Sequence, residues 1–316
     1  MTRKSLLLFA ATSVIWGSSF LFIRLALEHM PPATVVFGRT LLGAAFLVPL
    51  AASRQAFRGV RPVIAPIIIV TVLDMAAPTF LTAWGEQHVS SSVAGILTAT
   101  DPLFTAVLAL WLIRSEVPDR KRTLGLIIGF AGVVALLGID LRGSALELLG
   151  AGAVILSALG YASAALLYRR WLDDKAALGV TALMTAISSA AFLPPAAIDL
   201  PRQVPPVSSI LALATLGVVN TGVAYWLFYV LIDEAGAATA SVITYVMPVV
   251  ALFLGVALLG ERLTIGAVAG LVLIAVGAWL ATSRRAPSAD ADSGGRQGGA
   301  QSRGDEPSQP HDAEVR

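Results

Sequence analysis

Ten apolar stretches, each close to the length that crosses a lipid bilayer, run through most of this chain. Their expected bounds are 5–26, 33–52, 63–84, 91–113, 123–139, 147–168, 178–198, 208–232, 237–259 and 264–282. A spanning helix needs about 20 predominantly apolar residues. Only helices and closed barrels satisfy their backbone polar groups within lipid. The pattern therefore predicts an all-α membrane protein with ten transmembrane helices.

Composition agrees with this class and excludes several others. Hydrophobic residues make up 56% of the chain and charged residues only 13%, whereas soluble domains carry about 25% charged residues. The net charge of +2 is too small to indicate a nucleic-acid partner. The absence of cysteine excludes disulfides, thiolate catalysis and cysteine metal sites. The three histidines form no HExxH pair, so we expect no metal and no cofactor.

Loop charges predict the orientation. Arg3 and Lys4 precede the first stretch, which is too long for a signal peptide and is expected to remain as a helix. With the N-terminus inside, the outer loops hold Arg142, Arg202 and Arg262, and the other loop lysines and arginines before residue 286 are cytoplasmic. Such a bias follows the positive-inside rule. We expect a multi-pass protein of the cell (inner) membrane with both termini cytoplasmic.

A cassette that occurs twice divides the chain into halves. The copies begin at Ser90 and Gly236, about 145 residues apart, and share a proline within an apolar helix, a glutamate after it and two glycines seven residues apart. These pairs are Pro102 and Pro248, Glu116 and Glu261, Gly125 and Gly270, and Gly132 and Gly277; Asp74 likewise corresponds to Asn220. Because each half has an odd number of helices, the repeats must be inverted in the membrane. The expected domains are 1–141 and 142–285, followed by a disordered cytoplasmic tail at 286–316 whose composition offers little to bury.

Three ionisable residues are expected inside the membrane, where such groups are costly and are functional candidates. Asp74 and Asp101 lie near the midplane of consecutive helices, and Arg39 lies closer to the outer surface. They form either a structural ion pair or a site for substrate or protons. One hypothesis is that one aspartate pairs with Arg39 while the other takes up and releases a proton.

Polar and aromatic residues on several helices predict one central cavity. The candidate substrate-binding residues are Arg39, Asp74 and Asp101 together with Trp16, Tyr161, Asn220, Tyr225 and Tyr245. The alternative is that such side chains only join helices or bond their own backbone. Pro102 and Pro248 are expected in mid-helix, and Glu116 and Glu261 as capping or loop-pairing residues at helix ends. We therefore expect Asp101→Asn to impair transport more than Glu116→Gln.

The duplicated cassette, the segment IWGSSF at Ile15–Phe20 and the basic turn after the second helix resemble the EamA-like family of the drug/metabolite transporter superfamily. The resemblance covers about residues 5–282. It implies a bundle of ten helices around a central cavity. It also implies transport, often export, of small metabolites, amino acids or toxic compounds.

The main hypothesis is therefore a secondary transporter, not an enzyme. It would export a small metabolite, amino acid or drug-like solute by alternating access, with protons considered as the coupling ion. No GxxxxGK[ST] phosphate loop is present, so energy would come from a solute gradient. The alternatives are a membrane-embedded enzyme, which would lack a Ser–His arrangement, and a non-transporting subunit or sensor. The oligomeric state stays open.

Overall fold

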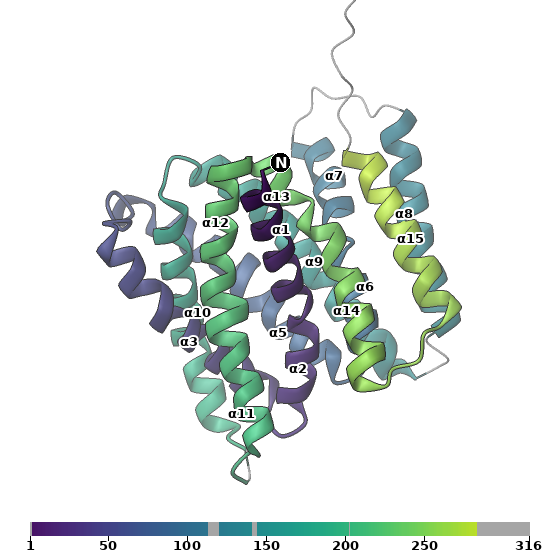
Figure 1. The fold of residues 1–316 in the computed structure, drawn as a ribbon, viewed down its shortest axis with the longest axis horizontal. Coiled ribbons are helices and arrows are strands. Elements are labelled where there is room, and N and C mark those ends of the chain that lie inside the picture. Colours follow the sequence, from purple (N-terminus) through teal and green to yellow (C-terminus); the bar gives the residue numbers. More distant parts are fainter. Residues whose placement is uncertain (1, 113–119, 141–143, 202, 283–316) are drawn as a thin grey trace, which may run out of the picture. The chain divides into compact units, whose positions relative to one another are not determined.

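The computed structural model describes residues 2–112, 120–140, 144–201 and 203–282. Within them, ten helical spans are long and apolar enough to cross a membrane, which confirms the expected fold class (Figure 1). The spans are Arg3–Leu27, Pro32–Ser53, Arg61–Glu86, Ser91–Leu110, Arg120–Gly138, Ala145–Trp171, Ala177–Ile198, Val207–Ala235, Thr239–Leu259 and Ile265–Thr282.

Five of these spans are single helices, and the other five are divided. The single ones are α3 (Pro32–Ser53), α8 (Arg120–Asp140), α9 (Ala145–Trp171), α10 (Ala177–Ile198) and α15 (Ile265–Thr282). The divided ones are α1 (Arg3–Gly17) with α2 (Ser19–Leu27); η1 (Arg61–Val63), α4 (Ile64–Thr71), η2 (Val72–Ala76) and α5 (Ala77–Glu86); α6 (Ser91–Thr98) with α7 (Asp101–Leu112); α11 (Val207–Ala214), η3 (Thr215–Val223) and α12 (Ala224–Ala235); and α13 (Ala237–Ser241) with α14 (Ile243–Leu259). Both η2 and η3 are π-helical.

Local signals fix several helix ends. The hydroxyl of Ser90 accepts from the Val93 amide at 3.2 Å at the start of α6, and Ser144 caps α9 in the same way. A serine hydroxyl satisfies an amide that has no partner within the helix. Gly236 separates α12 from α13 with φ of +82°, and Gly260 ends α14 with φ of +66°, values that glycine adopts without steric cost.

The ends of the spans define two sides of the bundle. The N-terminus, the start of α13 and the end of α15 lie at one side, which we call the terminal side (Figure 1). The turn after α2 and the start of α11 lie at the other side, which we call the opposite side (Figure 1).

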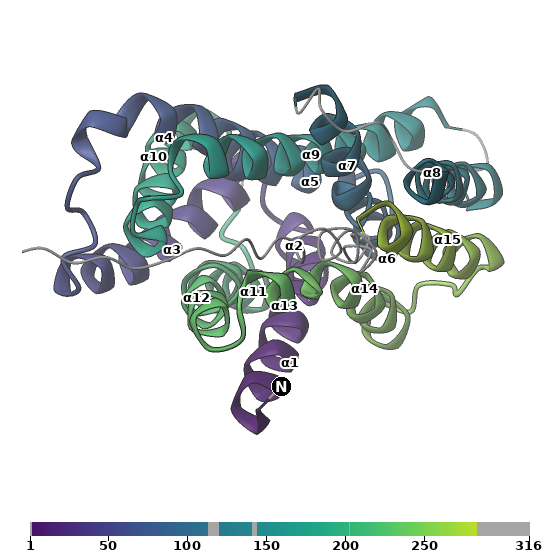
Figure 2. The same cartoon turned by 90° about the horizontal axis from the view of Figure 1, so that it is seen from above.

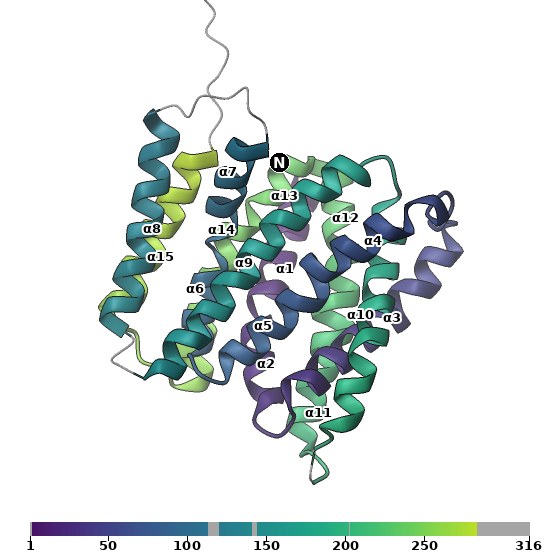
Figure 3. The same ribbon diagram turned by 180° about the vertical axis from the view of Figure 1, so that it is seen from behind.

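Helices α8 and α15 form the closest pair in the bundle and lie side by side in two views (Figures 2 and 3). Their contact is built on glycines: a Cβ at Gly277 would collide with the backbone of Gly129, and one at Gly125 would meet the backbone of Gly277 and Ala281. Small residues allow such backbone approach, which supplies packing in lipid where no hydrophobic force draws helices together. The repeated glycines thus have a packing role.

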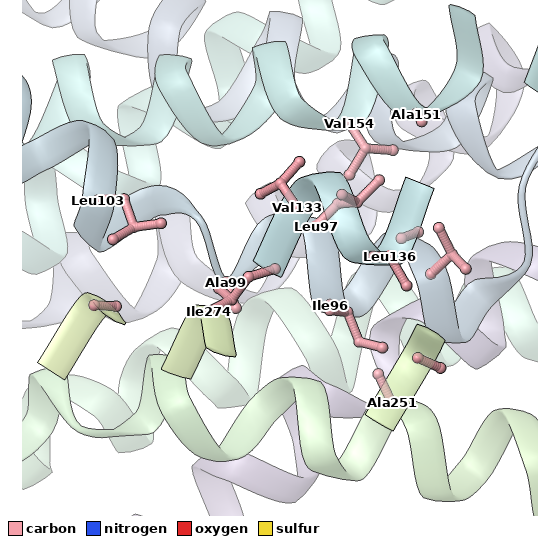
Figure 4. Close-up of a cluster of buried hydrophobic side chains, with 14 of the residues drawn as sticks. Ile96, Leu97, Ala99, Leu103, Val133, Leu136, Ala151, Val154, Ala251 and Ile274 are labelled. Atoms are coloured by element: carbon pink, nitrogen blue, oxygen red, sulfur yellow. The ribbon is translucent and has the colours of Figure 1, made fainter. Parts of the chain in front are cut away.

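A cluster of buried apolar side chains joins this pair to the rest of the bundle (Figure 4). Ile96, Leu97 and Leu103 from the fourth span contact residues of α8, α9, α14 and α15. Ile96, Leu97 and Leu103 are each fully buried. The cluster contains residues of both sequence halves, so the halves share one core.

A candidate binding cavity

A cavity of about 460 Å³ lies between the two halves of the chain. Among the described residues, its lining comes from eight spans, namely all except α8 and α15. The lining includes Trp16, Arg39, Asp74, Asp101, Tyr161 and Tyr225, which are six of the eight residues predicted from sequence. This volume lies within the range of small-molecule sites.

Asp74 is presented by the π-helical turn η2. Pro78 follows in α5 and has no amide hydrogen, so it cannot bond the carbonyl of residue 74 as the α-helical pattern requires. The helix widens just before it: the Ala77 amide bonds to the carbonyl of Val72, five residues back. π-helical turns within α-helices are found frequently at functional sites. The proline thus accounts for the unusual backbone that carries this carboxylate.

Asp101 is the first residue of α7, directly after a break in the fourth span. The expectation of Pro102 in mid-helix is wrong, because α6 ends at Thr98 and Pro102 is the second residue of a new helix, where a missing amide hydrogen costs little. Thr105 donates a hydrogen bond of 3.3 Å to the Asp101 carboxylate. A carboxylate at a helix N-terminus also interacts favourably with the helix dipole.

Arg39 does not pair with either aspartate in this conformation. Its Nε donates a 3.0 Å hydrogen bond to the Thr221 hydroxyl in η3. Close packing sets this contact, because a Cβ at Gly43 would meet Thr221 and one at Gly217 would meet the Arg39 carbonyl. Within the described parts of the chain, the ion pairs are Lys4–Glu234 and Lys175–Asp174. The predicted Arg–Asp pair is therefore absent from these residues, and a helix-joining bond takes its place.

Aromatic rings form one wall of the cavity. Trp16 lies against Phe228 and Tyr225, with ring centroids 4.9 and 5.4 Å apart, and Tyr225 stacks on Tyr229 at 6.2 Å. The Trp16 indole donates to the Asn220 carbonyl at 3.2 Å, and the Tyr229 hydroxyl is bonded to Thr181. Trp16 and Tyr229 are thus held by bonds at their polar edges.

Two predicted residues do not line the cavity. Asn220 is fully buried, and its amide group bonds to the Ile15 carbonyl and the hydroxyls of Ser18 and Ser19, where α1 gives way to α2. Tyr245 packs against the core cluster and bonds to the Thr282 hydroxyl at 3.0 Å. Asn220 therefore stabilises an interrupted helix beside the cavity. It corresponds to Asp74 in the first half, which does line the cavity.

On the opposite side, a glutamate from the second half closes the bundle against the first half. The Glu261 carboxylate accepts hydrogen bonds from the amides and hydroxyls of both Ser91 and Ser92. Oε1 accepts from the Ser91 amide at 2.8 Å and from the Ser91 hydroxyl at 3.0 Å, and Oε2 accepts from the Ser92 amide at 3.0 Å and from the Ser92 hydroxyl. The prediction of a capping role is thus confirmed for Glu261, although the helix it caps is in the other half. Its counterpart Glu116 lies outside the described residues.

Glu86, which the sequence analysis missed, lies nearby on the opposite side. Its side chain is fully buried, and neither carboxylate oxygen has a hydrogen-bond partner among the described residues. The Arg24 side chain bonds to the backbone carbonyl of Glu86 instead of its carboxylate. The apolar stretch predicted from sequence ends at residue 84, which left Glu86 outside it, whereas α5 continues to Glu86 itself.

Known proteins resemble this chain over nearly its full described length. The sequence model of the EamA-like transporter family matches residues 3–138 and 148–283. An inner membrane transporter of Escherichia coli, YedA, itself uncharacterised, is 27% identical over 80% of this chain and 82% of its own length. A transporter of S-adenosylmethionine and S-adenosylhomocysteine from Chlamydia trachomatis is 29% identical over 83% of each chain. A solved crystal structure shares the fold, with a TM-score of 0.64 at 19% identity over 89% of this chain and 97% of its own.

Proposed function

Because the chain belongs to the EamA-like transporter family through both of its halves, we propose that it exports a small solute from the cytoplasm by alternating access. The proposed location is the cell (inner) membrane, with the N-terminus and the tail at 286–316 in the cytoplasm. The terminal side is then the cytoplasmic side. The proposed repeats are 1–141 and 142–285, with their interface at the cavity.

The observation that carries this proposal is the one-sided reach of the cavity. Toward the terminal side, its lining continues to Ala177, the first residue of α10, and to Ile232 near the end of α12. Toward the opposite side, the lining stops at Ile23, Thr82 and Gly95, about one turn short of the helix ends. Beyond these residues Ala26, Ala83 and Ser91 are buried, and Glu261 bonds the two halves together. This arrangement suits an inward-facing state that receives a solute from the cytoplasm.

Inverted repeats supply a way to reach the other state. When each half adopts the conformation of its partner, the cavity closes on the terminal side and opens on the opposite side. The interrupted spans lie around the cavity, whereas α8 and α15 lie outside it. We propose that the interrupted spans rearrange and that the α8–α15 pair does not.

A metabolite comparison of cells that overproduce the protein with cells that lack it tests function and direction together. Export predicts that one solute accumulates inside the deleted cells and appears in the medium of the overproducing cells. S-adenosylmethionine and S-adenosylhomocysteine are the first solutes to measure, given the named substrates of the chlamydial relative. A solute that instead rises inside the overproducing cells would overturn the proposed direction.

A further inference from the structure

We propose that the cavity takes a singly charged organic cation with a planar ring, bound in exchange for one proton. This inference rests on the proposed transport function, because it names the solute class of that same cavity. It is carried by the charges of the lining residues, by their hydrogen-bond partners and by the aromatic wall.

The cavity holds an excess of negative charge. Among the described lining residues, Asp74 and Asp101 are acidic and Arg39 is basic, which gives a formal charge of −1 when all three are ionised. Arg39 is bonded to Thr221, and neither aspartate has an ion-pair partner in the described chain. The titratable groups around the two aspartates are Arg39 from α3, Tyr161 and Tyr168 from α9, and Tyr225 and Tyr229 from α12. No second cation is present among them.

A net charge inside a membrane is costly, so something that enters the cavity must restore neutrality. One proton on either aspartate does so, and one monovalent cation does so equally. The two states give a balanced exchange: the cation enters, the aspartate releases its proton to water, and the reverse occurs on the other side. A zwitterion or an anion leaves the negative charge uncompensated.

The walls favour a ring-bearing cation as well. Trp16, Tyr225, Phe228 and Tyr229 present contiguous aromatic surface, and ring faces attract cations and stack with planar groups. Two donors that an anion would need are already used: the Trp16 indole donates to the backbone carbonyl of Asn220, and Thr105 donates to Asp101. Besides the Arg39 guanidinium and hydroxyl groups, the lining presents ring faces and carboxylate oxygens, which suit a cation.

Three indole compounds separate charge from ring shape: tryptamine is a cation, tryptophan a zwitterion and indole-3-acetate an anion at neutral pH. Their binding to the purified full-length protein is measured by calorimetry in lipid nanodiscs. We expect tryptamine to bind at least about tenfold more tightly than the other two. The heat should vary with the ionisation enthalpy of the buffer, as release of one proton requires.

Equal or tighter binding of tryptophan or indole-3-acetate would overturn the cation assignment, as would binding of none of the three at millimolar concentration. A heat independent of the buffer would overturn the exchange with a proton. These measurements on the unmodified protein do not depend on how any variant folds.

Charge variants test the same inference from the protein side. Asp74→Asn or Asp101→Asn should remove the preference for tryptamine, and the double variant, which leaves only Arg39 charged, should prefer indole-3-acetate. Glu147→Gln, at a glutamate near the start of α9 and outside the cavity, is the control and should bind as the parent does. A folded double variant that still prefers tryptamine contradicts the charge argument.

Binding needs no flux, so tryptamine binding without any transport would overturn the proposed function and leave this site assignment in place.

Discussion

Replacement of Glu261 by glutamine should open the opposite side of the bundle. The Glu261 carboxylate accepts four hydrogen bonds from Ser91 and Ser92, and these bonds join the segment after α14 to the start of α6. Glutamine keeps one acceptor oxygen, while its amide nitrogen faces donors. Two charge-assisted bonds are lost at about 1.5 kcal/mol each, or about 3 kcal/mol in total. The ratio of closed to open states should then fall about a hundredfold.

The chain has no cysteine, so one introduced thiol reports access to the cavity. Thr98→Cys places the thiol in the cavity lining, and a membrane-impermeant maleimide is applied from the opposite side. Labelling should be slow in Thr98→Cys alone and about a hundredfold faster when Glu261→Gln is added. The Glu147 amide bonds to the Ser144 hydroxyl that caps α9, and the Glu147 side chain has no bond to the other half among the described residues, so Glu147→Gln should leave the rate unchanged. Equal rates with and without Glu261→Gln would refute the view that these bonds hold the bundle closed.

Four further outcomes are expected. Gly277→Val should lower the stability of the detergent-purified protein by about 1–3 kcal/mol through overpacking, whereas Gly152→Val, which meets open space, should not; thermal unfolding compares them. Glu86→Met should leave the unfolding temperature unchanged or raise it, because the carboxylate has no described hydrogen-bond partner; a large decrease would indicate a hidden partner. Asp101→Asn should abolish solute flux at an unchanged protein level in the membrane, as measured in vesicles. A reporter fused after Ala281 should be active only in the cytoplasm, and activity outside the cell would contradict the topology.

The sequence was sufficient to predict the helices and much of the cavity lining. Length and apolar composition determine a membrane span, so the ten stretches lie where the ten spans are found. Asp74 and Asp101 stood out because charge is rare at membrane depth, and both line the cavity. The repeated glycines indicated close helix contact, and Gly277 against Gly129 is such a contact.

The partners of individual side chains could not be predicted. Arg39 bonds to Thr221 because small residues bring α3 and η3 close together. The spacing of residues along the sequence does not show which two helices approach so closely. Pro102 was expected in mid-helix and the break before Asp101 was not predicted, because a proline alone does not tell whether a helix continues or restarts. Glu86 was missed because a helix can continue past the end of its apolar run into the buried edge of the bundle.

The π-helical turns at Val72–Ala76 and Thr215–Val223 lie at corresponding places in the two halves of the chain. In a π-helical turn each amide bonds to the carbonyl five residues back, so the turn is wider than an α-helical one. The turns carry Asp74 and Asn220, which occupy corresponding positions in the two halves. In the first half the wide turn therefore presents a carboxylate to the cavity, and in the second half it presents an amide that bonds the two parts of the first span together.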